Sequence, residues 1–159
     1  MTTSLGAGSL LAVATDLVTL ETEAPEQFVD VTDLLAERVR RSGIRHGFGS
    51  IQTCHTTAAL AVNEDEPLLI DDMRRLLARL APNELRYGHD DLARRGAAED
   101  ERTNGAAHCR SLLLGVSQTF HVVDGAIQLG RWQRLFLVEL DGPRPRSLSI
   151  VVLGLKGDE

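Results

Sequence analysis

Several residue types are scarce in this chain of 159 residues, and each scarcity excludes a class of protein. The two cysteines, Cys54 and Cys109, are too few for the disulfide framework of a small secreted domain. We expect both to be small, buried core side chains. No apolar run reaches the roughly 20 residues that span a membrane. The apolar start of the chain has no basic segment and soon meets Asp16, so we expect a strand rather than a signal peptide, in a cytoplasmic protein without membrane contacts.

Positive charge is also scarce. Asp and Glu number 23 against 17 Lys and Arg, which gives a net charge of −6 and disfavours nucleic-acid binding. Only one of the 17 basic residues, Lys156, is a lysine. Because a guanidinium binds carboxylates and phosphates through two parallel hydrogen bonds, local arginine clusters remain candidates for binding an anionic substrate.

The rest of the composition is that of an ordinary globular domain, with 43% hydrophobic and 25% charged residues. Apolar residues at three- and four-residue steps predict three helices, from about Pro25 to Gly43, from Leu69 to Leu80 and from Asn104 to Leu114. Apolar and β-branched stretches predict strands at 10–22, 46–62, 117–123, 131–140 and 147–155.

These elements predict one domain over residues 1–159, of the α+β class. Strands outnumber helices, and the C-terminal strands follow one another as a meander through the hairpin signal Asp124-Gly125. We therefore expect a compact, mostly antiparallel, sandwich-like sheet with about three helices. The polar stretch 82–104 has no clear period, and a loop of that length inside a compact domain is often functional.

Three of the five histidines stand at the ends of predicted elements, which is where folds present functional side chains. His55 closes a strand, His89 lies in the polar stretch, and His108 lies in the first turns of the third helix. Three imidazoles from separate elements would hold zinc or a similar ion and leave a fourth position open. Their spacing matches no short zinc motif, so the alternative is that each is a structural histidine.

Other polar residues also allow two interpretations. Glu64 follows a strand and precedes a helix, where it is either a general base or metal ligand, or only a turn acid. Asn104 is a candidate N-cap for the third helix. Arg144 and Arg146 flank a proline in a hairpin, which suits either a phosphate site or a charged hairpin tip. Trp132, the only tryptophan, lies in a predicted strand and is expected in the core.

Five stretches of the sequence together carry a resemblance to a known family. CHTTAALAVNEDEP, YGHDD, ERTNGAAH, DGAIQLGRWQ and ELDGPRPR resemble, in order and spacing, the YjbQ-like family, also called secondary thiamine-phosphate synthase enzymes. The resemblance covers nearly the whole chain and implies a compact α+β domain that assembles as a homotrimer. The polar residues shared with the family fall on His55, Thr56, Asn63, Glu64, His89, Asn104, His108, Trp132, Gln133, Glu139, Asp141 and Arg144.

The resemblance implies an enzyme that acts on a phosphorylated small molecule, with a secondary ability to make thiamine phosphate. In that reaction a pyrimidine diphosphate joins a thiazole phosphate and pyrophosphate leaves. A divalent metal ion, zinc or magnesium, is expected at His55, His89 and His108, and imidazole ligands suit zinc better than magnesium. We predict Glu64, Asn104 and His108 as catalytic residues, and Thr56, Trp132, Gln133 and Arg144 as residues that bind the substrate and its phosphate.

Two alternatives from other classes remain open. A metal-dependent hydrolase would use the ion to activate water and Glu64 as the base, and it fits imidazole ligands better than the synthase does. A non-enzymatic trimer would bind a metal ion or a small molecule without converting it.

The sequence also offers a reason for the homotrimer that the resemblance implies. The strands predicted at 117–123 and 147–155 are apolar with little charge, and we expect exposed edges there to pair with a neighbouring chain. The polar stretch that carries His89 would then dock against that neighbour. We therefore expect the site at or near a subunit boundary.

Overall fold

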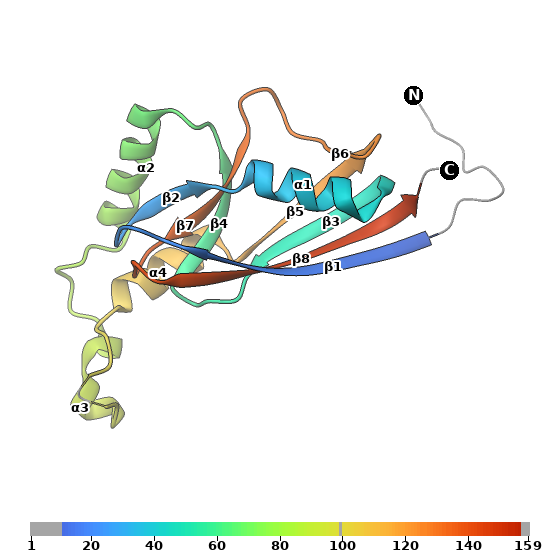
Figure 1. Cartoon of the computed structure of the whole chain (residues 1–159). Helices are drawn as coiled ribbons and strands as arrows, with labels where there is room; N and C mark the ends of the chain where they lie inside the picture. The colour runs from blue at the N-terminus through green and yellow to red at the C-terminus, as the bar shows by residue number, and fades with distance from the viewer. Residues whose placement is uncertain (1–10, 99, 157–159) are drawn as a thin grey trace.

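The computed structural model describes residues 11–98 and 100–156. Helices and strands follow in the order β1 (Leu11–Glu21), β2 (Gln27–Asp30), α1 (Thr32–Ser42), β3 (Ile44–Thr53), β4 (Ala58–Asn63), α2 (Pro67–Leu80), the 3-10 turn η1 (Gly88–Asp90), α3 (Leu92–Arg95), α4 (Gly105–Leu114), β5 (Ser117–Val123), β6 (Ala126–Ile127), β7 (Arg134–Glu139) and β8 (Pro145–Lys156). The strands form two sheets in which the pairs are antiparallel. The predicted α+β, sandwich-like class is confirmed, with the single-turn α3 as a fourth helix (Figure 1).

The larger sheet has the strand order β1-β8-β3-β5-β6. Its longest strand, β8, alternates strictly, so that Leu148, Ile150 and Val152 are buried while the residues between them face the other way. Helix α1 lies along the buried face, where Leu35 and Val39 join the same apolar cluster (Figure 1). The opposite face of the sheet has no covering layer within the part of the chain that the structure describes.

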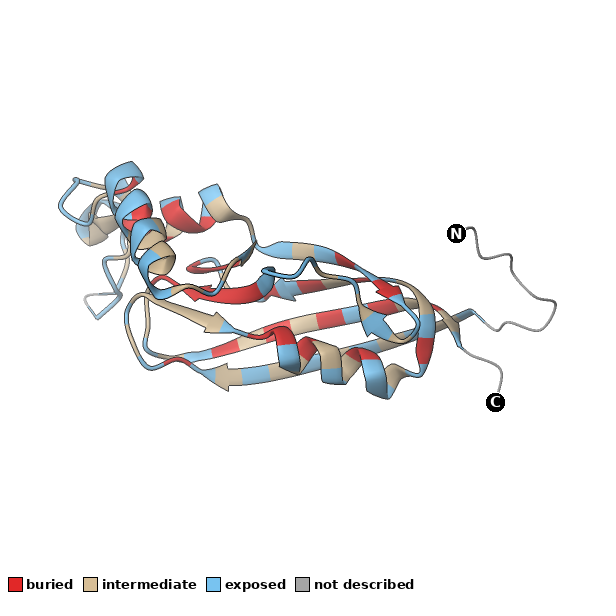
Figure 2. Cartoon of the chain, turned by 90° about the horizontal axis from the view of Figure 1, so that it is seen from above, coloured by how far each residue is buried: buried red, intermediate tan, exposed pale blue. Residues whose placement is uncertain are grey.

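The smaller sheet, with the order β2-β7-β4, forms the middle layer of the molecule. Leu135 and Leu137 on one face of β7 pack into the cluster under the large sheet. Phe136 and Val138 on its other face pack against Leu77 of α2 and against α4. Because both faces are covered, β7 is buried along almost its whole length, and Figure 2 shows buried residues gathered on the interior strands and on one side of α1.

The first predicted helix begins later than expected. The structure places Phe28 in strand β2, which pairs with β7 through Phe28 and Val138, and α1 begins only at Thr32. Phe28 continues the helical spacing of the apolar residues, but a long-range strand pairing overrides it. The predicted end of this helix is confirmed, since Gly43 adopts φ 69° in the left-handed region.

The second and third helices and the hairpin are confirmed by α2, by α4, and by positive φ at Asp124 and Gly125 between β5 and β6. The polar stretch 82–104 is less irregular than expected, because it contains η1 and α3. No helix within residues 11–98 and 100–156 is long and apolar enough to cross a membrane.

Three side chains predicted in the core are exposed. Cys54 lies in the connection after β3, and Cys109 lies on the outer side of α4, whose inner side is formed by Ala106, Ala107, Arg110 and Ser111. Trp132 precedes β7 instead of lying in it and is 60% exposed. Cys54 and Trp132 lie outside the strands, and Cys109 lies off the buried face of its helix. These three predictions are therefore wrong.

The predicted exposed edge is wrong for β8, which lies between β1 and β3. Strand β5 pairs with β3 on one side, while on its other side only Val122 and Val123 pair with β6, so the rest of β5 has no strand partner there within the described chain. The edges of the large sheet are β1 and β6. What remains exposed is its apolar outer face, which carries Leu11, Val13, Leu17, Phe48 and Val151.

Candidate functional site

The end of β7 and the start of β8 are joined by a buried ion pair. Glu139 is 0% exposed and Arg146 is 1% exposed, and the guanidinium binds both carboxylate oxygens, with Nε 2.6 Å from Oε2. Arg146 also donates to the carbonyl and the hydroxyl of Thr57, at 3.2 and 3.1 Å. A bidentate, fully desolvated pair of this kind fixes both side chains. Arg146 is therefore neither a charged hairpin tip nor a free phosphate ligand, which corrects that interpretation.

The remaining lone pairs of Glu139 are also engaged. Its Oε2 accepts from the Thr22 hydroxyl at 2.9 Å, and its Oε1 accepts from the backbone N–H groups of Leu140 and Asp141 at 2.9 and 2.8 Å. Burial alone raises the pKa of Glu139, but the hydrogen bonds from Arg146, Asp141 and Thr22 outweigh burial and lower the pKa below its ordinary value. The carboxylate is charged and rigid at neutral pH.

His55 lies against this pair. Its Nε2 accepts a hydrogen bond of 2.8 Å from the backbone N–H of Ser147, so the neutral ring carries its proton on Nδ1. Burial, and then the charge of Arg146, lower the pKa of His55 below its ordinary value, although Glu139 opposes them. To bind a metal ion through Nε2, His55 would have to release Ser147.

The other two predicted histidines meet face to edge. The ring centroids of His89, in η1, and His108, in the first turns of α4, are 4.5 Å apart with an interplanar angle of 67°. Burial, and then the neighbouring His89, lower the pKa of His108, although Asp141 opposes them. His108 is thus neutral at neutral pH and available to accept a proton.

The contact between the two histidines depends on how η1 docks on the N-terminus of α4. The carboxylate of Asp90 accepts from the backbone N–H of Gly105 at 2.8 Å. A Cβ at Gly105 would lie only 2.4 Å from the Cβ of Tyr87, so no other residue fits without moving the segment. The Tyr87 hydroxyl donates to the Pro82 carbonyl at 2.8 Å and holds the other side of the loop. The glycine is therefore what lets His89 approach α4.

Asp141 connects the start of α4 to the arginines. It accepts from the Asn104 side-chain amide at 2.8 Å, and its carboxylate lies 3.0 Å from Arg144 and 3.5 Å from Arg102. Arg102 also donates to the Asp141 carbonyl at 2.7 Å. Asn104 occupies the N-cap position of α4, but its side chain makes no capping hydrogen bond. The predicted N-cap position is therefore confirmed, but the capping hydrogen bond is absent: the amide N–H binds Asp141, and the side-chain oxygen has no partner in the described chain.

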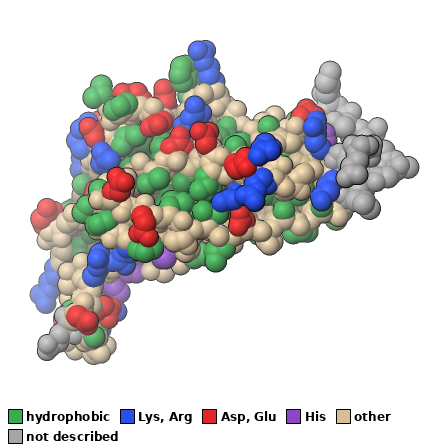
Figure 3. Space-filling model, in the orientation of Figure 1, with side chains coloured by type: hydrophobic (Ala, Val, Ile, Leu, Met, Phe, Trp, Pro, Cys, Tyr) green, Lys and Arg blue, Asp and Glu red, His purple; other side chains and the backbone are tan. Residues whose placement is uncertain are grey.

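Arginines surround this end of the molecule. Arg95 donates to the carbonyl of His89 at 3.0 Å, while Arg102 and Arg144 extend from Asp141. In Figure 3 histidine and basic side chains lie together at the junction between the body and the projecting segment that carries α3. We call His55, His89, His108, Asn104, Asp141 and Arg144 the histidine end.

A cleft of about 210 Å³ opens beside the histidine end, at the start of α4. Asn104, Asp141 and Asp90 contribute to its walls, and Leu140 and Pro25 are apolar surfaces in it. The side-chain oxygen of Asn104 is buried without a hydrogen-bond partner in the described chain. The cleft therefore offers a small organic ligand both apolar contact and polar groups.

The remaining predicted site residues lie elsewhere. In the pairing of β4 with β7, Ala58 faces Glu139 and Asn63 faces Arg134, so the two strands run from the histidine end to Glu64 at the far end. Five residues separate these positions along β4, a span of roughly 16 Å at 3.3 Å per residue. We call Asn63, Glu64, Trp132 and Gln133 the open end. Thr56, by contrast, is exposed beside His55, at the histidine end.

Of the three predicted metal ligands, the structure brings His89 and His108 into contact. Among residues 11–98 and 100–156, no group of three His, Cys, Asp or Glu side chains is arranged to hold a metal ion. The three-histidine metal site stays a prediction.

The buried Glu139–Arg146 pair and the docking role of Gly105 were not found from the residues alone. A charged residue in an apolar strand usually marks the surface, and nothing local shows that the partner lies on the next strand. The available signal was the unbroken apolar run of β7 directly before Glu139, which indicates burial on both faces.

The comparisons with known proteins agree with one another. The family model described as UPF0047 protein YjbQ-like matches residues 16–155. A UPF0047 protein of Methanothermobacter thermautotrophicus is 34% identical over 147 residues, which cover 92% of this chain and 96% of the relative. UPF0047 protein YugU of Bacillus subtilis is 32% identical over 137 residues, 85% of this chain and 96% of the relative.

Solved structures show the same fold. A YbjQ-like protein of Sulfolobus solfataricus superposes with a TM-score of 0.82 at 32% identity, covering 91% of this chain and 99% of the other. A protein of Aeropyrum pernix superposes with a TM-score of 0.79 at 35% identity, covering 89% and 98%. On its sequence and its fold, the chain belongs to the UPF0047 (YjbQ-like) family.

Proposed function

We propose that the chain is an enzyme that acts on a phosphorylated small molecule at the histidine end. The observation that carries the proposal is the contact between His89 and a neutral His108, next to Arg95, Arg102 and Arg144. A neutral imidazole donates a hydrogen bond through its ring N–H, and guanidiniums stabilise phosphate charge. Imidazole donors beside arginines are suited to a substrate whose leaving group is a phosphate, because they stabilise the negative charge that develops on it.

The reaction we propose is the formation of thiamine phosphate, which is the activity that the family resemblance implies. The methylene carbon of the pyrimidine diphosphate loses its bond to the diphosphate oxygen, and the ring nitrogen of the thiazole phosphate supplies the electron pair of the new C–N bond. Pyrophosphate leaves with the electrons of the broken bond. No net proton transfer is required, so the task of the protein is to stabilise the charge that develops on pyrophosphate.

The residues of the histidine end have separate tasks in this proposal. Arg144 and Arg102, held in place by Asp141, face the leaving phosphates, and His108 and His89 donate hydrogen bonds to them. Asn104 presents its unpartnered carbonyl oxygen at the edge of the cleft, where it accepts a hydrogen bond from an amino group of the ligand. Thr56 lies close enough along the chain to His55 to contribute a hydroxyl.

We also propose that a divalent ion binds at the histidine end. One chain brings two imidazoles together, and imidazole ligands suit zinc better than magnesium. When bound, such an ion would neutralise charge on the diphosphate. The residues of the described chain do not by themselves provide a third ligand next to the histidine pair.

We further propose a homotrimer whose sites are shared between chains. The outer face of the large sheet exposes Val13, Leu17, Phe48 and Val151, an apolar surface that a second copy would cover. The open end, with the exposed Trp132, cannot reach its own histidine end along roughly 16 Å of strand. In a closed ring, the open end of one chain would meet the histidine end of the next, and Glu64, Trp132 and Gln133 would complete the pocket.

The test is an assay of the purified protein with the pyrimidine diphosphate and the thiazole phosphate, with and without Zn²⁺ or Mg²⁺. We expect thiamine phosphate and an equal amount of pyrophosphate. His108→Asn should lower the rate about 100-fold, the lower end of what a preorganised donor to a developing negative charge contributes. His46→Asn, which changes a partly exposed histidine beside Asp124 at the β5–β6 hairpin, is the matched control and should retain the rate.

Each other result identifies a different function. Release of phosphate or pyrophosphate without a joined product, lost in His108→Asn, would favour a hydrolase with His108 as the base. Glu64 could act as the base in that case only from a neighbouring chain, because it lies at the open end of its own. Binding of either substrate without any product would overturn the enzyme proposal and favour a binding module.

A further inference from the structure

A second cleft lies on the other side of the molecule, between α1 and the edge of the large sheet. Its volume is about 280 Å³, and it is lined by Ala14, Thr15, Asp16, Arg38, Arg41, Ser42, Ile150 and Val152. On β8, Ile150 and Val152 lie three and five residues beyond Ser147, which binds His55. At about 3.3 Å per residue this is roughly 10 to 17 Å from the histidine end.

The cleft forms because α1 does not cover the edge strand. Helix α1 packs mainly toward β6, at the opposite edge of the large sheet from β1, and toward β7 of the small sheet. The inner side chains of β1 at this level are Ala14 and Asp16, and a residue as small as alanine leaves space under the helix. Together with Ile150 and Val152, Ala14 gives the cleft an apolar floor.

The walls of the cleft are basic. Nε of Arg38 lies 3.0 Å from Oδ2 of Asp16, yet this Nε–H is buried and aligned with no acceptor in the described chain. A buried donor without an aligned acceptor is unfavourable unless a ligand or water binds it. Arg41, one helical turn later, forms no ion pair with any described residue, whereas Arg40 is turned away and binds Glu37.

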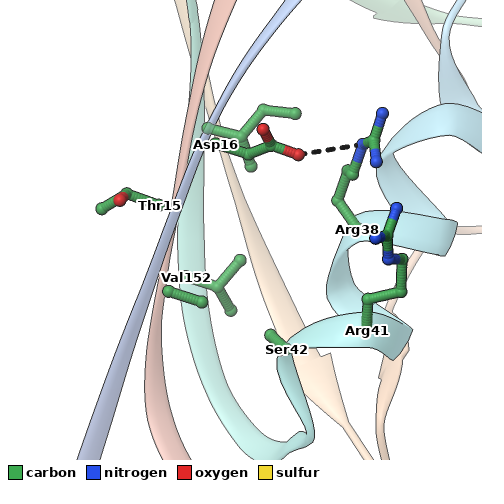
Figure 4. A pocket seen from close by; sticks show the side chains of 8 residues that line it. Thr15, Asp16, Arg38, Arg41, Ser42 and Val152 are labelled. Carbon is green, nitrogen blue, oxygen red and sulfur yellow. Dashed lines mark ion pairs between the residues drawn. The ribbon is translucent and has the colours of Figure 1, made fainter.

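The two guanidiniums are close enough to act on one ligand. Figure 4 shows the side chains of Arg38 and Arg41 extending in the same direction from α1, with Asp16 on the strand opposite Arg38 and Val152 beneath. Two positive charges and one negative charge leave the cleft with a net positive charge, in a chain whose net charge is −6. An anion is therefore drawn to this cleft against the overall field of the protein.

We propose that this cleft binds a small organic oxyanion. Its phosphate or carboxylate group lies between Arg38 and Arg41 and accepts from the Arg38 Nε–H that is not aligned with Asp16, and its apolar body packs on Ala14, Ile150 and Val152. The volume is close to the lower end of the range of about 300–1,000 Å³ for ligand pockets, which fits a small metabolite rather than a nucleotide. The site is separate from the histidine end and serves binding, with no part in the proposed reaction.

The experiment is a titration followed by ¹H–¹⁵N NMR, including the arginine Nε–H signals, with methyl phosphate and with acetate as separate probes at constant ionic strength. We expect saturable shifts at residues 14–16, 38–42 and 150–152. A larger response to methyl phosphate identifies a phosphate monoester as the ligand class, and a larger response to acetate identifies a carboxylate. Shifts that grow linearly with concentration for both probes would overturn the proposal.

Two variants distinguish binding by a specific site from attraction by net charge alone. Arg41→Ala should weaken binding at least tenfold, because it removes the cleft guanidinium that no described residue pairs with. Arg40→Ala removes the same charge one residue away, from a side chain paired with Glu37, and should change the affinity less than twofold. Equal weakening in the two variants would show that net charge alone attracts the probe, and would also overturn the proposal. Neither variant touches the histidine end, so the assay described above stays independent of this result.

Discussion

The two ends of the small sheet differ in how far their side chains are buried and hydrogen-bonded. At the end of β7, Glu139 is completely buried and its hydrogen-bonding capacity is met by Arg146, Thr22 and two backbone N–H groups. Before the start of the same strand, Trp132 is 60% exposed, and the guanidinium of its neighbour Arg131 lies over the ring, 4.6 Å from the ring centroid. One end is rigid without help from any other molecule, while the other exposes a large apolar ring to solvent.

In the proposed function, this difference separates the end that holds the reacting groups from the end that a second chain would complete. A charged pair that is fixed by bidentate hydrogen bonds gives His55 and the following hairpin a stable frame. An exposed tryptophan has the opposite character, since such a side chain gains most by burial in an interface. The comparison therefore predicts that changes at the histidine end act within one chain, while changes at the open end act between chains.

The largest effect should follow from removing one partner of the buried pair. Glu139→Ala leaves Arg146 charged, buried and without its carboxylate, which should lower the free energy of unfolding by about 3–5 kcal/mol. Urea unfolding of the variant and the parent protein measures this directly. The double variant Glu139→Leu with Arg146→Met replaces the pair by apolar groups and should recover most of the loss. A loss below about 1 kcal/mol in Glu139→Ala would mean that water reaches the pair, contrary to its burial.

The next effect concerns the contact between the two histidines. Gly105→Ala adds a methyl group 2.4 Å from the Cβ of Tyr87, so the segment that carries His89 must move away from α4. We expect a loss of stability of about 1–3 kcal/mol from overpacking and a rate of thiamine phosphate formation lowered by roughly tenfold to 100-fold.

Gly88→Ala is the matched control for this change. It makes the same substitution in the same segment, where an added Cβ meets nothing within 4 Å. Its stability and rate should remain close to those of the parent protein. If Gly105→Ala behaves like Gly88→Ala, the docking of η1 on α4 does not position His89.

A smaller effect is expected at the open end, and only in the assembled protein. Trp132→Ala should lower the rate about tenfold while the fold is retained, because the exposed ring makes few contacts within its own chain. Refolding equal amounts of Trp132→Ala and His108→Asn chains together then tests sharing. With random mixing, about one site in four combines an intact histidine end with an intact open end of the neighbour, so activity should recover to about a quarter of the parent value.

Sites confined to one chain would give no such recovery. The mixture would then show only the average of the two variants, about one twentieth of the parent activity. Sedimentation equilibrium of the same samples gives the assembly state, and a mass near 17.3 kDa at micromolar concentration would contradict both the trimer and the shared site.

The elements that the sequence predicted are those whose signal is local. Strand β8 alternates over twelve residues, and α2 keeps a helical period up to the proline that follows it, so both were found. Strand β2 has only four residues and takes its conformation from pairing with β7, so the period of α1 was extended wrongly through Phe28. The histidines were recognised as candidates from their places at element ends. That His89 and His108 contact each other, while His55 binds Ser147 instead, depends on docking between segments far apart in the sequence. No local pattern encodes such docking.

The smallest effect is the pH dependence of stability. The pKa values of His55 and His108 are lowered in the folded chain, chiefly by burial, so between these values and the ordinary value near 6.5 the unfolded chain binds more protons than the folded one. The free energy of unfolding should therefore be constant above about pH 7 and decrease as the pH falls below about 6.5. Glu139, whose pKa is also lowered, adds a second decrease below about 4.5, where unfolded carboxyl groups take up protons first. Urea unfolding at a series of pH values, with NMR titration of the histidine ring protons, separates the two windows. A flat profile between pH 7 and 5 would show that both rings are protonated in the folded chain as readily as in the unfolded one.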